Sequence, residues 1–239
     1  MSTPGGDTWI FAYGSLMWRP GFAFEAAERA RLTGYRRCFC IYSMYHRGSP
    51  LRPGLVLGLD RGGTCEGIAY RVAADRAAEV RHYLRVREQI SGVYREMVLP
   101  VELAASRQEV LALAYVVDRA HPIYAGPLPL ARQARLIRGA RGVSGANLDY
   151  LINTLRHLAE LGIRERQLER VLALIGPHTA RHPRAGQISP YVAGLLETAR
   201  RQPAGPMRRV KPDRRRRFLY RLRMGGEAWA GGRLLSRQS

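Results

Sequence analysis

Hydrophobic residues in the first half of the chain follow the short runs and the two-residue period of β-strands. Residues 9–13 form an apolar run that stops at Gly14, which predicts a buried strand followed by a sharp turn. Further strands are predicted at 37–43, at 55–59 with a tight turn at 60–63, at 68–72, at 93–101 and at 110–117. One helix interrupts them, from Asp75 as its N-cap to about Arg87, with apolar side chains at a helical spacing.

In the second half of the chain the hydrophobic period becomes that of helices. One predicted helix begins near Pro129. A second covers 144–161 with Ser144 as its N-cap, and a third covers 165–174 and stops at Gly176. Strands with one embedded helix, followed by a helical part, indicate an α+β fold rather than regular βαβ alternation.

The amino-acid composition of the chain changes after Gly176. Prolines recur and four consecutive arginines occupy 214–217, so the apolar periodicity that a core requires is lost. We therefore predict one folded domain that ends near residue 176 and a Pro/Arg-rich C-terminal extension over 177–239 that is partly mobile.

The formal net charge of +20 is unevenly distributed along the chain. Residues 200–239 carry 13 basic and 2 acidic residues, a net charge of +11, which leaves +9 for residues 1–199. A moderately basic body suits an enzyme with a small anionic substrate. The tail leaves open a protein that contacts nucleic acid or another anionic surface, although we favour a solvated extension.

Targeting signals and cysteines indicate the compartment. No apolar run reaches the roughly 18 residues that span a bilayer, and the N-terminal residues lack the pattern of a signal peptide. Cys38, Cys40 and Cys65 are odd in number and suit neither a disulfide framework nor a zinc site. We expect reduced, buried thiols in a cytoplasmic protein.

Tyr13-Gly14-Ser15-Leu16 is the first candidate for chemistry. A buried strand that ends in Gly-Ser turns sharply and leaves amide groups without ladder partners, which can bind a carboxylate or an oxyanion. By itself this pattern also fits an ordinary turn. No Gly-x-Ser-x-Gly surrounds Ser15, so a serine nucleophile is not indicated.

Glu88 is the second candidate, because it falls at the end of the predicted helix. The negative end of the helix dipole and partial burial would both raise its pKa toward the range useful for proton transfer. A solvated glutamate paired with Arg85 or Arg87 is the alternative. The six histidines show no paired-ligand spacing, so we predict no metal site.

Eight short segments, in a fixed order, carry a resemblance to a known family. They are 11–22 (Phe-Ala-Tyr-Gly-Ser-Leu-Met-Trp-Arg-Pro-Gly-Phe), 34–37 (Gly-Tyr-Arg-Arg), 53–57, 65–70 (Cys-Glu-Gly-Ile-Ala-Tyr), 83–88 (Tyr-Leu-Arg-Val-Arg-Glu) with Gly92 and Tyr94, 112–116, 121–127 (His-Pro-Ile-Tyr-Ala-Gly-Pro) and 142–151. Over residues 8–176 the sequence resembles the ChaC-type γ-glutamylcyclotransferases.

The resemblance implies a small mixed β-barrel flanked by helices and a carbon–nitrogen lyase without metal or organic cofactor. Its substrate would be glutathione, whose α-amine attacks its own γ-carbonyl to give 5-oxoproline and Cys-Gly. The resemblance implies that the amides of the Tyr13-Gly14-Ser15-Leu16 loop hold the γ-glutamyl group and that Glu88 is the acid/base. It also implies that Tyr124 lines the substrate pocket, although a buried structural tyrosine is the alternative.

The sequence does not decide between two substrate classes, glutathione and other γ-glutamyl compounds. Residues 89–93 form a longer connection after Glu88 than in compact family members, and this connection borders the proposed site. Other γ-glutamyl amino acids or amines are therefore alternatives to glutathione. The sequence does not predict the oligomeric state.

Overall fold

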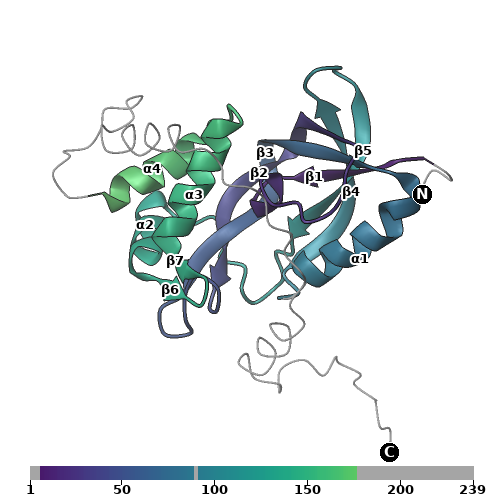
Figure 1. Ribbon diagram of the computed structural model, residues 1–239. Helices are drawn as coiled ribbons and strands as arrows, with labels where there is room; N and C mark the ends of the chain where they lie inside the picture. Colours follow the sequence, from purple (N-terminus) through teal and green to yellow (C-terminus); the bar gives the residue numbers. More distant parts are fainter. Residues whose placement is uncertain (1–5, 89–90, 177–239) are drawn as a thin grey trace, which may run out of the picture.

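Five strands close into a barrel in the order β1-β3-β2-β4-β5 (Figure 1). The structure, a computed structural model, describes residues 6–88 and 91–176, so the predicted extension at 177–239 lies outside the described residues. The strands are β1 Thr8–Ala12, β2 Ala26–Ser43, β3 Gly54–Val72, β4 Tyr94–Leu103 and β5 Glu109–Val117. β1 runs parallel to β5, whereas the other neighbours are antiparallel, so the predicted mixed barrel is confirmed.

The long strands β2 and β3 differ from the sequence prediction. The tight turn expected at 60–63 does not occur, because β3 continues through these residues while paired with β2. The pairing register shifts between Thr33 and Tyr35, and Gly34, Gly62 and Gly63 adopt positive φ there. Glycines at positive φ allow a bulge that bends both strands without ending them.

Four α-helices and two short 3₁₀ turns complete the fold. Their bounds are η1 Ser15–Met17, η2 Ala74–Arg76, α1 Ala77–Glu88, α2 Leu130–Gly139, α3 Asn147–Glu160 and α4 Arg166–Ile175. The helix predicted from Ser144 begins only at Asn147, because residues 141–146 form the small hairpin of β6 Arg141–Gly142 and β7 Gly145–Ala146. Within the described ranges, none of these helices has the length and apolar character that crossing a bilayer demands.

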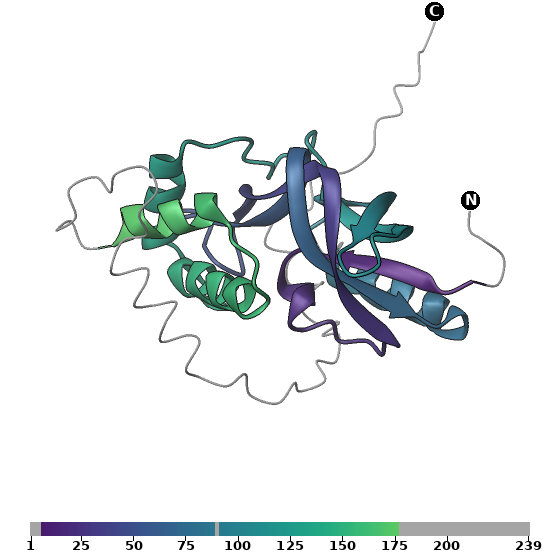
Figure 2. The ribbon, with the colours of Figure 1, turned by 90° about the horizontal axis from the view of Figure 1, so that it is seen from above.

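The helices cover the barrel at two places. Figures 1 and 2 show α1 beside the barrel strands and α2, α3 and α4 grouped at the extended ends of β2 and β3. Val80 and Leu84 of α1 are buried against barrel residues such as Tyr70. Phe39 of β2 and Leu55 of β3 are buried in a separate cluster with side chains of the three other helices. This arrangement places the end of α1, the end of β1 and the start of α3 around one pocket.

Candidate active site

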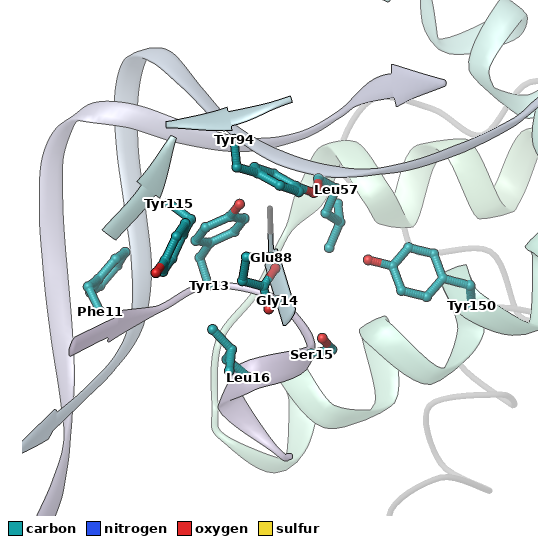
Figure 3. A pocket seen from close by; sticks show the side chains of 10 residues that line it. All are labelled: Phe11, Tyr13, Gly14, Ser15, Leu16, Leu57, Glu88, Tyr94, Tyr115 and Tyr150. Atoms are coloured by element: carbon teal, nitrogen blue, oxygen red, sulfur yellow. The ribbon is translucent and has the colours of Figure 1, made fainter. Parts of the chain in front are cut away.

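A pocket that opens to solvent lies between the barrel and α3 (Figure 3). It brings together five residues predicted from the sequence: Tyr13, Gly14, Ser15, Leu16 and Glu88. The other lining residues are Phe11, Leu57, Tyr94, Tyr115 and Tyr150. The pocket is thus built by residues from β1, β3, α1, β4, β5 and α3.

The loop after β1 presents unpaired amides at this pocket. In η1 the amide of Met17 donates to the carbonyl of Gly14 at 2.9 Å, which closes the turn behind the loop. The described residues offer no backbone acceptor to the amides of Gly14, Ser15 and Leu16. Unpaired backbone amides at a concave site are suited to bind a carboxylate or a developing oxyanion.

Arg37 holds the loop from behind. Its Nε donates to the Tyr13 carbonyl at 2.5 Å, and its Nη2 donates to the Glu66 carbonyl at 2.5 Å. Because the C=O and N–H of a trans peptide point in opposite directions, the amide of Gly14 points away from Arg37. Tyr70 supports the same loop, since its hydroxyl donates to the Met17 carbonyl at 2.7 Å. Strands β2 and β3 therefore fix the orientation of the loop peptides.

Glu88 is the last residue of α1, and its side chain is 19% exposed. Burial raises the pKa of its carboxyl, and the adjacent Arg87 guanidinium opposes this rise. The Nε of Arg87 lies 3.0 Å from Glu88 Oε1. The pair with Arg87 that the alternative predicted therefore exists. The carboxylate is not solvated at the surface, however, because it lines the pocket. A carboxylate with a raised pKa is a stronger base than an ordinary glutamate, which favours proton transfer.

Four phenols line the same pocket as this carboxylate (Figure 3). Burial raises the pKa of Tyr13 and of Tyr94 well above the ordinary value, and it raises the pKa of Tyr150 to about 12. These side chains therefore stay protonated at neutral pH and can act as hydrogen-bond donors. The Tyr94 hydroxyl donates to the Leu57 carbonyl at 2.8 Å, which fixes its ring in the wall.

Sequence reasoning did not assign Tyr94, Tyr115 or Tyr150 to the site. All three occur in segments that carry the family resemblance, so a signal existed. That signal did not distinguish core tyrosines from pocket tyrosines, because both pack against apolar neighbours. Only the tertiary arrangement of β4, β5 and α3 brings these three rings to the pocket that holds Glu88, and the Tyr115 hydroxyl itself donates to Glu96 at 3.2 Å.

Arg87 connects Glu88 to the loop. Its Nη2 donates to Ser15 Oγ at 2.9 Å, and its Nη1 donates to the Arg19 carbonyl at 2.6 Å and the Tyr83 hydroxyl at 3.1 Å. One guanidinium therefore fixes both the loop and the carboxylate. Its charge also favours the ionised form of Glu88.

We expect Arg87→Met to move the acidic limb of the pH profile of kcat/KM to higher pH. Arg87 lowers the pKa of Glu88, so its removal raises this pKa further, and a base with a higher pKa is ionised only at higher pH. Arg85→Met is the matched control, because Arg85 pairs with Glu96 at 2.8 Å and is half-exposed. Profiles that shift equally in both variants would contradict a specific Arg87–Glu88 interaction.

Tyr124 does not line this pocket. Its hydroxyl donates to Asp60 Oδ2 at 3.0 Å, and burial together with this hydrogen bond raises its pKa to about 12. Asp60 is buried and also accepts from Arg119 Nε at 2.7 Å and Arg36 Nη2 at 3.3 Å. Tyr124 thus belongs to a polar cluster around Asp60, and its contact with substrate stays a prediction.

Metal-ligating residues do not gather in the described part of the chain. Over residues 6–88 and 91–176, no group of three or more His, Cys, Asp or Glu is placed to hold a metal ion. What the pocket combines is one buried carboxylate, several phenol donors and a row of unpaired amides. This combination suits proton transfer beside a bound anion.

Comparison with known proteins identifies the family. The sequence model of the ChaC-like protein family matches residues 8–177. The chain belongs to the ChaC-like family. Within it, the glutathione-specific gamma-glutamylcyclotransferase 1 of human is 38% identical over 170 residues, which cover 70% of this chain and 76% of that protein. The Escherichia coli glutathione-specific gamma-glutamylcyclotransferase is 34% identical over 170 residues, covering 71% of this chain and 73% of that protein.

Solved structures agree with this assignment at the level of the fold. The crystal structure of a yeast γ-glutamyl cyclotransferase specific to glutathione matches with a TM-score of 0.64 and 23% identity. The match covers 74% of this chain and 99% of the yeast chain. The α+β barrel with flanking helices is therefore a fold that this chain shares with the yeast protein.

Proposed function

We propose that this ChaC-like protein is a γ-glutamylcyclotransferase that converts glutathione to 5-oxoproline and Cys-Gly. The observation that carries the proposal is the position of Glu88, a mostly buried carboxylate of raised pKa in the same pocket as the unpaired amides of the Gly14–Leu16 turn. The names of its relatives support glutathione as the substrate.

The substrate carries both its nucleophile and its electrophile. The α-amine of the γ-glutamyl group attacks the γ-carbonyl carbon, a new C–N bond closes the five-membered lactam, and the bond to the cysteine nitrogen breaks. A pocket that holds the bent substrate converts this attack into a favourable intramolecular step, for which effective molarities of about 10⁵ M and more are known.

Proton transfer by Glu88 accompanies the two bond changes. The carboxylate takes a proton from the substrate ammonium, which frees the amine lone pair. As the new C–N bond forms, the attacking nitrogen loses a second proton, and Glu88 gives a proton to the departing cysteine nitrogen. The two protons lost by the attacking nitrogen match the two that the free amine of Cys-Gly gains on becoming an ammonium. General acid/base catalysis of this kind contributes about 10²- to 10⁴-fold. Its elevated pKa makes Glu88 a stronger base than an ordinary glutamate.

The loop amides provide the fixed dipoles that the reaction needs. Those of Gly14, Ser15 and Leu16 bind either the α-carboxylate of the γ-glutamyl group or the oxyanion of the tetrahedral intermediate. The protonated phenol of Tyr150 supplies a further donor, whereas the Tyr94 hydroxyl already donates to the Leu57 carbonyl. The mechanism needs no covalent intermediate and no cofactor. Because the C–N bond breaks without the addition of water, the protein is a carbon–nitrogen lyase in this proposal.

The proposal includes a cytoplasmic location. Cys38, Cys40 and Cys65 are free thiols in the structure, as expected in a compartment that keeps cysteines reduced. Glutathione itself is such a reductant.

Release of 5-oxoproline from glutathione by the purified full-length chain tests this function directly. We expect turnover of glutathione and much slower turnover of γ-glutamyl-alanine, measured by chromatography of both products. Faster turnover of γ-glutamyl-alanine would instead assign the chain to other γ-glutamyl compounds. No product from either substrate would refute the proposed function.

A further inference from the structure

The charged side chains that α2 exposes to solvent are all basic. Arg132, Arg135 and Arg138 are exposed at a spacing of three residues, and the exposed Arg141 follows two residues after the helix ends. Residues at this spacing are neighbours on a helix surface, and the rise of the helix places the first and the last of the three about 9 Å apart. We call these four arginines the α2 basic face. Figure 1 shows α2 among the helices that lie away from α1.

Acidic side chains do not balance this face. Residues 119–148 include five arginines and neither aspartate nor glutamate. The fifth arginine, Arg119, binds the carboxylate of Asp60. Within residues 6–88 and 91–176, no carboxylate forms an ion pair with an arginine of the α2 basic face. Stable protein surfaces usually intersperse charges of both signs, so this face departs from the ordinary pattern.

The α2 basic face is unfavourable for the helix that carries it. Arg132 lies in the first turn, where the positive end of the helix dipole disfavours a cation, and this turn contains no acidic residue. Like charges three residues apart repel each other as well. Arg138 has a compensating contact, because its Nη2 donates to the Leu174 carbonyl at 2.9 Å near the end of α4. An arrangement that breaks local rules without a local compensation is typical of a binding surface.

The surroundings of the α2 basic face add positive charge. Both acids of the neighbouring α4, Glu165 at its N-cap and Glu169, already pair with arginines. The exposed Arg166 and Arg170 of α4 have no carboxylate partner in the part of the chain that the structure describes. Residues 177–239, which follow α4 in the sequence, include 15 basic and 3 acidic residues. So much charge of one sign matches a polyanion better than a single small anion.

The composition of the face indicates which polyanion fits it. The planar guanidinium binds phosphate oxygens through paired hydrogen bonds. Residues 130–146 contain no aromatic residue on which the bases of a single strand could stack. Helices that bind membranes expose large apolar side chains beside their basic ones, whereas α2 exposes none. These features favour the outside of a duplex over a single strand or a lipid surface.

We propose that the α2 basic face binds the phosphate backbone of duplex nucleic acid without reading its base sequence. Each strand of a duplex presents a phosphate about every 3.4 Å along the axis, so the 9 Å or so between Arg132 and Arg138 faces two or three phosphates. The binding surface is separate from the catalytic pocket, because none of its arginines lines that pocket. The inference therefore goes beyond the proposed function and does not rest on it.

The salt dependence of binding tests the proposal in the full-length chain. Fluorescence anisotropy measures the affinity for a labelled DNA duplex of about 20 base pairs and mixed sequence, between about 50 and 200 mM salt. We expect Arg132→Gln/Arg135→Gln to lower the slope of log K against log salt concentration by about 2, because each lost phosphate contact removes about 0.9. Arg132→Lys/Arg135→Lys keeps both charges and should keep the slope of the wild type.

Arg61→Gln/Arg76→Gln is the matched control. Both residues are exposed and lie outside the helical group, so the variant removes the same charge from another part of the surface and should keep the wild-type slope. An equal fall in the control would reduce the effect to net charge and overturn the inference. An unchanged slope in Arg132→Gln/Arg135→Gln would assign binding to other basic segments and overturn it too.

Two further outcomes would also contradict the proposal. One is a wild-type chain that does not bind the duplex at about 50 mM salt, where such contacts are strong. The other is a loss in Arg132→Gln/Arg135→Gln that appears with vesicles of phosphatidylglycerol and phosphatidylcholine but not with the duplex, which would assign the face to a membrane surface. Equal circular dichroism and Tm of all variants show that the comparison concerns folded proteins.

Discussion

Glu88→Gln is expected to lower kcat for release of 5-oxoproline from glutathione by about 10²- to 10⁴-fold. Glutamine has nearly the same shape but cannot accept a proton from the substrate ammonium. Because the loop amides and the phenols remain, the KM should change far less than kcat. Initial rates at saturating and limiting glutathione separate the two effects.

The same substitution should not reduce stability. Burial raises the pKa of Glu88 in the folded protein above that of an exposed glutamate, so at neutral pH the folded state holds its charge at a cost. A neutral amide avoids this cost, although it weakens the contact with Arg87. An inactive variant with an unchanged or raised Tm would therefore show that activity was lost through chemistry and not through unfolding.

Glu79→Gln provides the matched control for this experiment. Glu79 lies in the first turn of the same helix and is exposed, so its replacement should leave kcat unchanged. If Glu88→Gln retained wild-type kcat, Glu88 would not be the acid/base, and the phenols of Tyr13, Tyr94 and Tyr150 would become the groups to test.

Local patterns predicted the elements that build the pocket but not all of its wall. The apolar run before Gly14 and the helical spacing before Glu88 are local signals, and the strand and the helix end near the predicted residues. Tyr150, by contrast, approaches Glu88 only because α3 packs at the extended ends of β2 and β3. No spacing along the chain encodes that approach.

The bend of the long strands shows the same limit. Asp60-Arg61-Gly62-Gly63 has the composition of a tight turn, yet Asp60 and Arg61 pair with β2 and strand β3 continues through the two glycines. Asp60 lies in the strand because Arg36, Arg119 and Tyr124 bind its buried carboxylate. Two of these partners come from residues about 60 positions away, so turn propensity was overridden by contacts that the local sequence does not reveal.

Arg37 links the pocket to the helical part of the chain. Its side chain is fully buried, and besides the Tyr13 and Glu66 carbonyls it contacts the carboxylate of Glu165, the N-cap residue of α4. Burial raises the pKa of Glu165, whereas Arg37 lowers it. One buried cation therefore satisfies the loop carbonyl, a strand carbonyl and the carboxylate at the start of α4.

Arg37→Met is expected to reduce the free energy of unfolding by about 3–5 kcal/mol, the usual loss when one partner of a buried ion pair is removed. It leaves Glu165 without its cation and two carbonyls without donors. Urea unfolding at pH 7 measures the loss. Arg36→Met on the same strand is the control, because Arg36 is partly exposed and Asp60 keeps its other partners, so a loss within about 1 kcal/mol is expected.

The pH dependence of this loss identifies its cause. Without Arg37 the pKa of Glu165 in the folded state rises further above its unfolded value, so the folded state binds the proton more tightly than the unfolded chain. Stability of the variant relative to wild type should therefore recover as the pH falls from 7 through this raised pKa, since protonation removes the unpaired charge. A loss that stays constant with pH would instead assign the effect to packing and to the unpaired carbonyls of Tyr13 and Glu66.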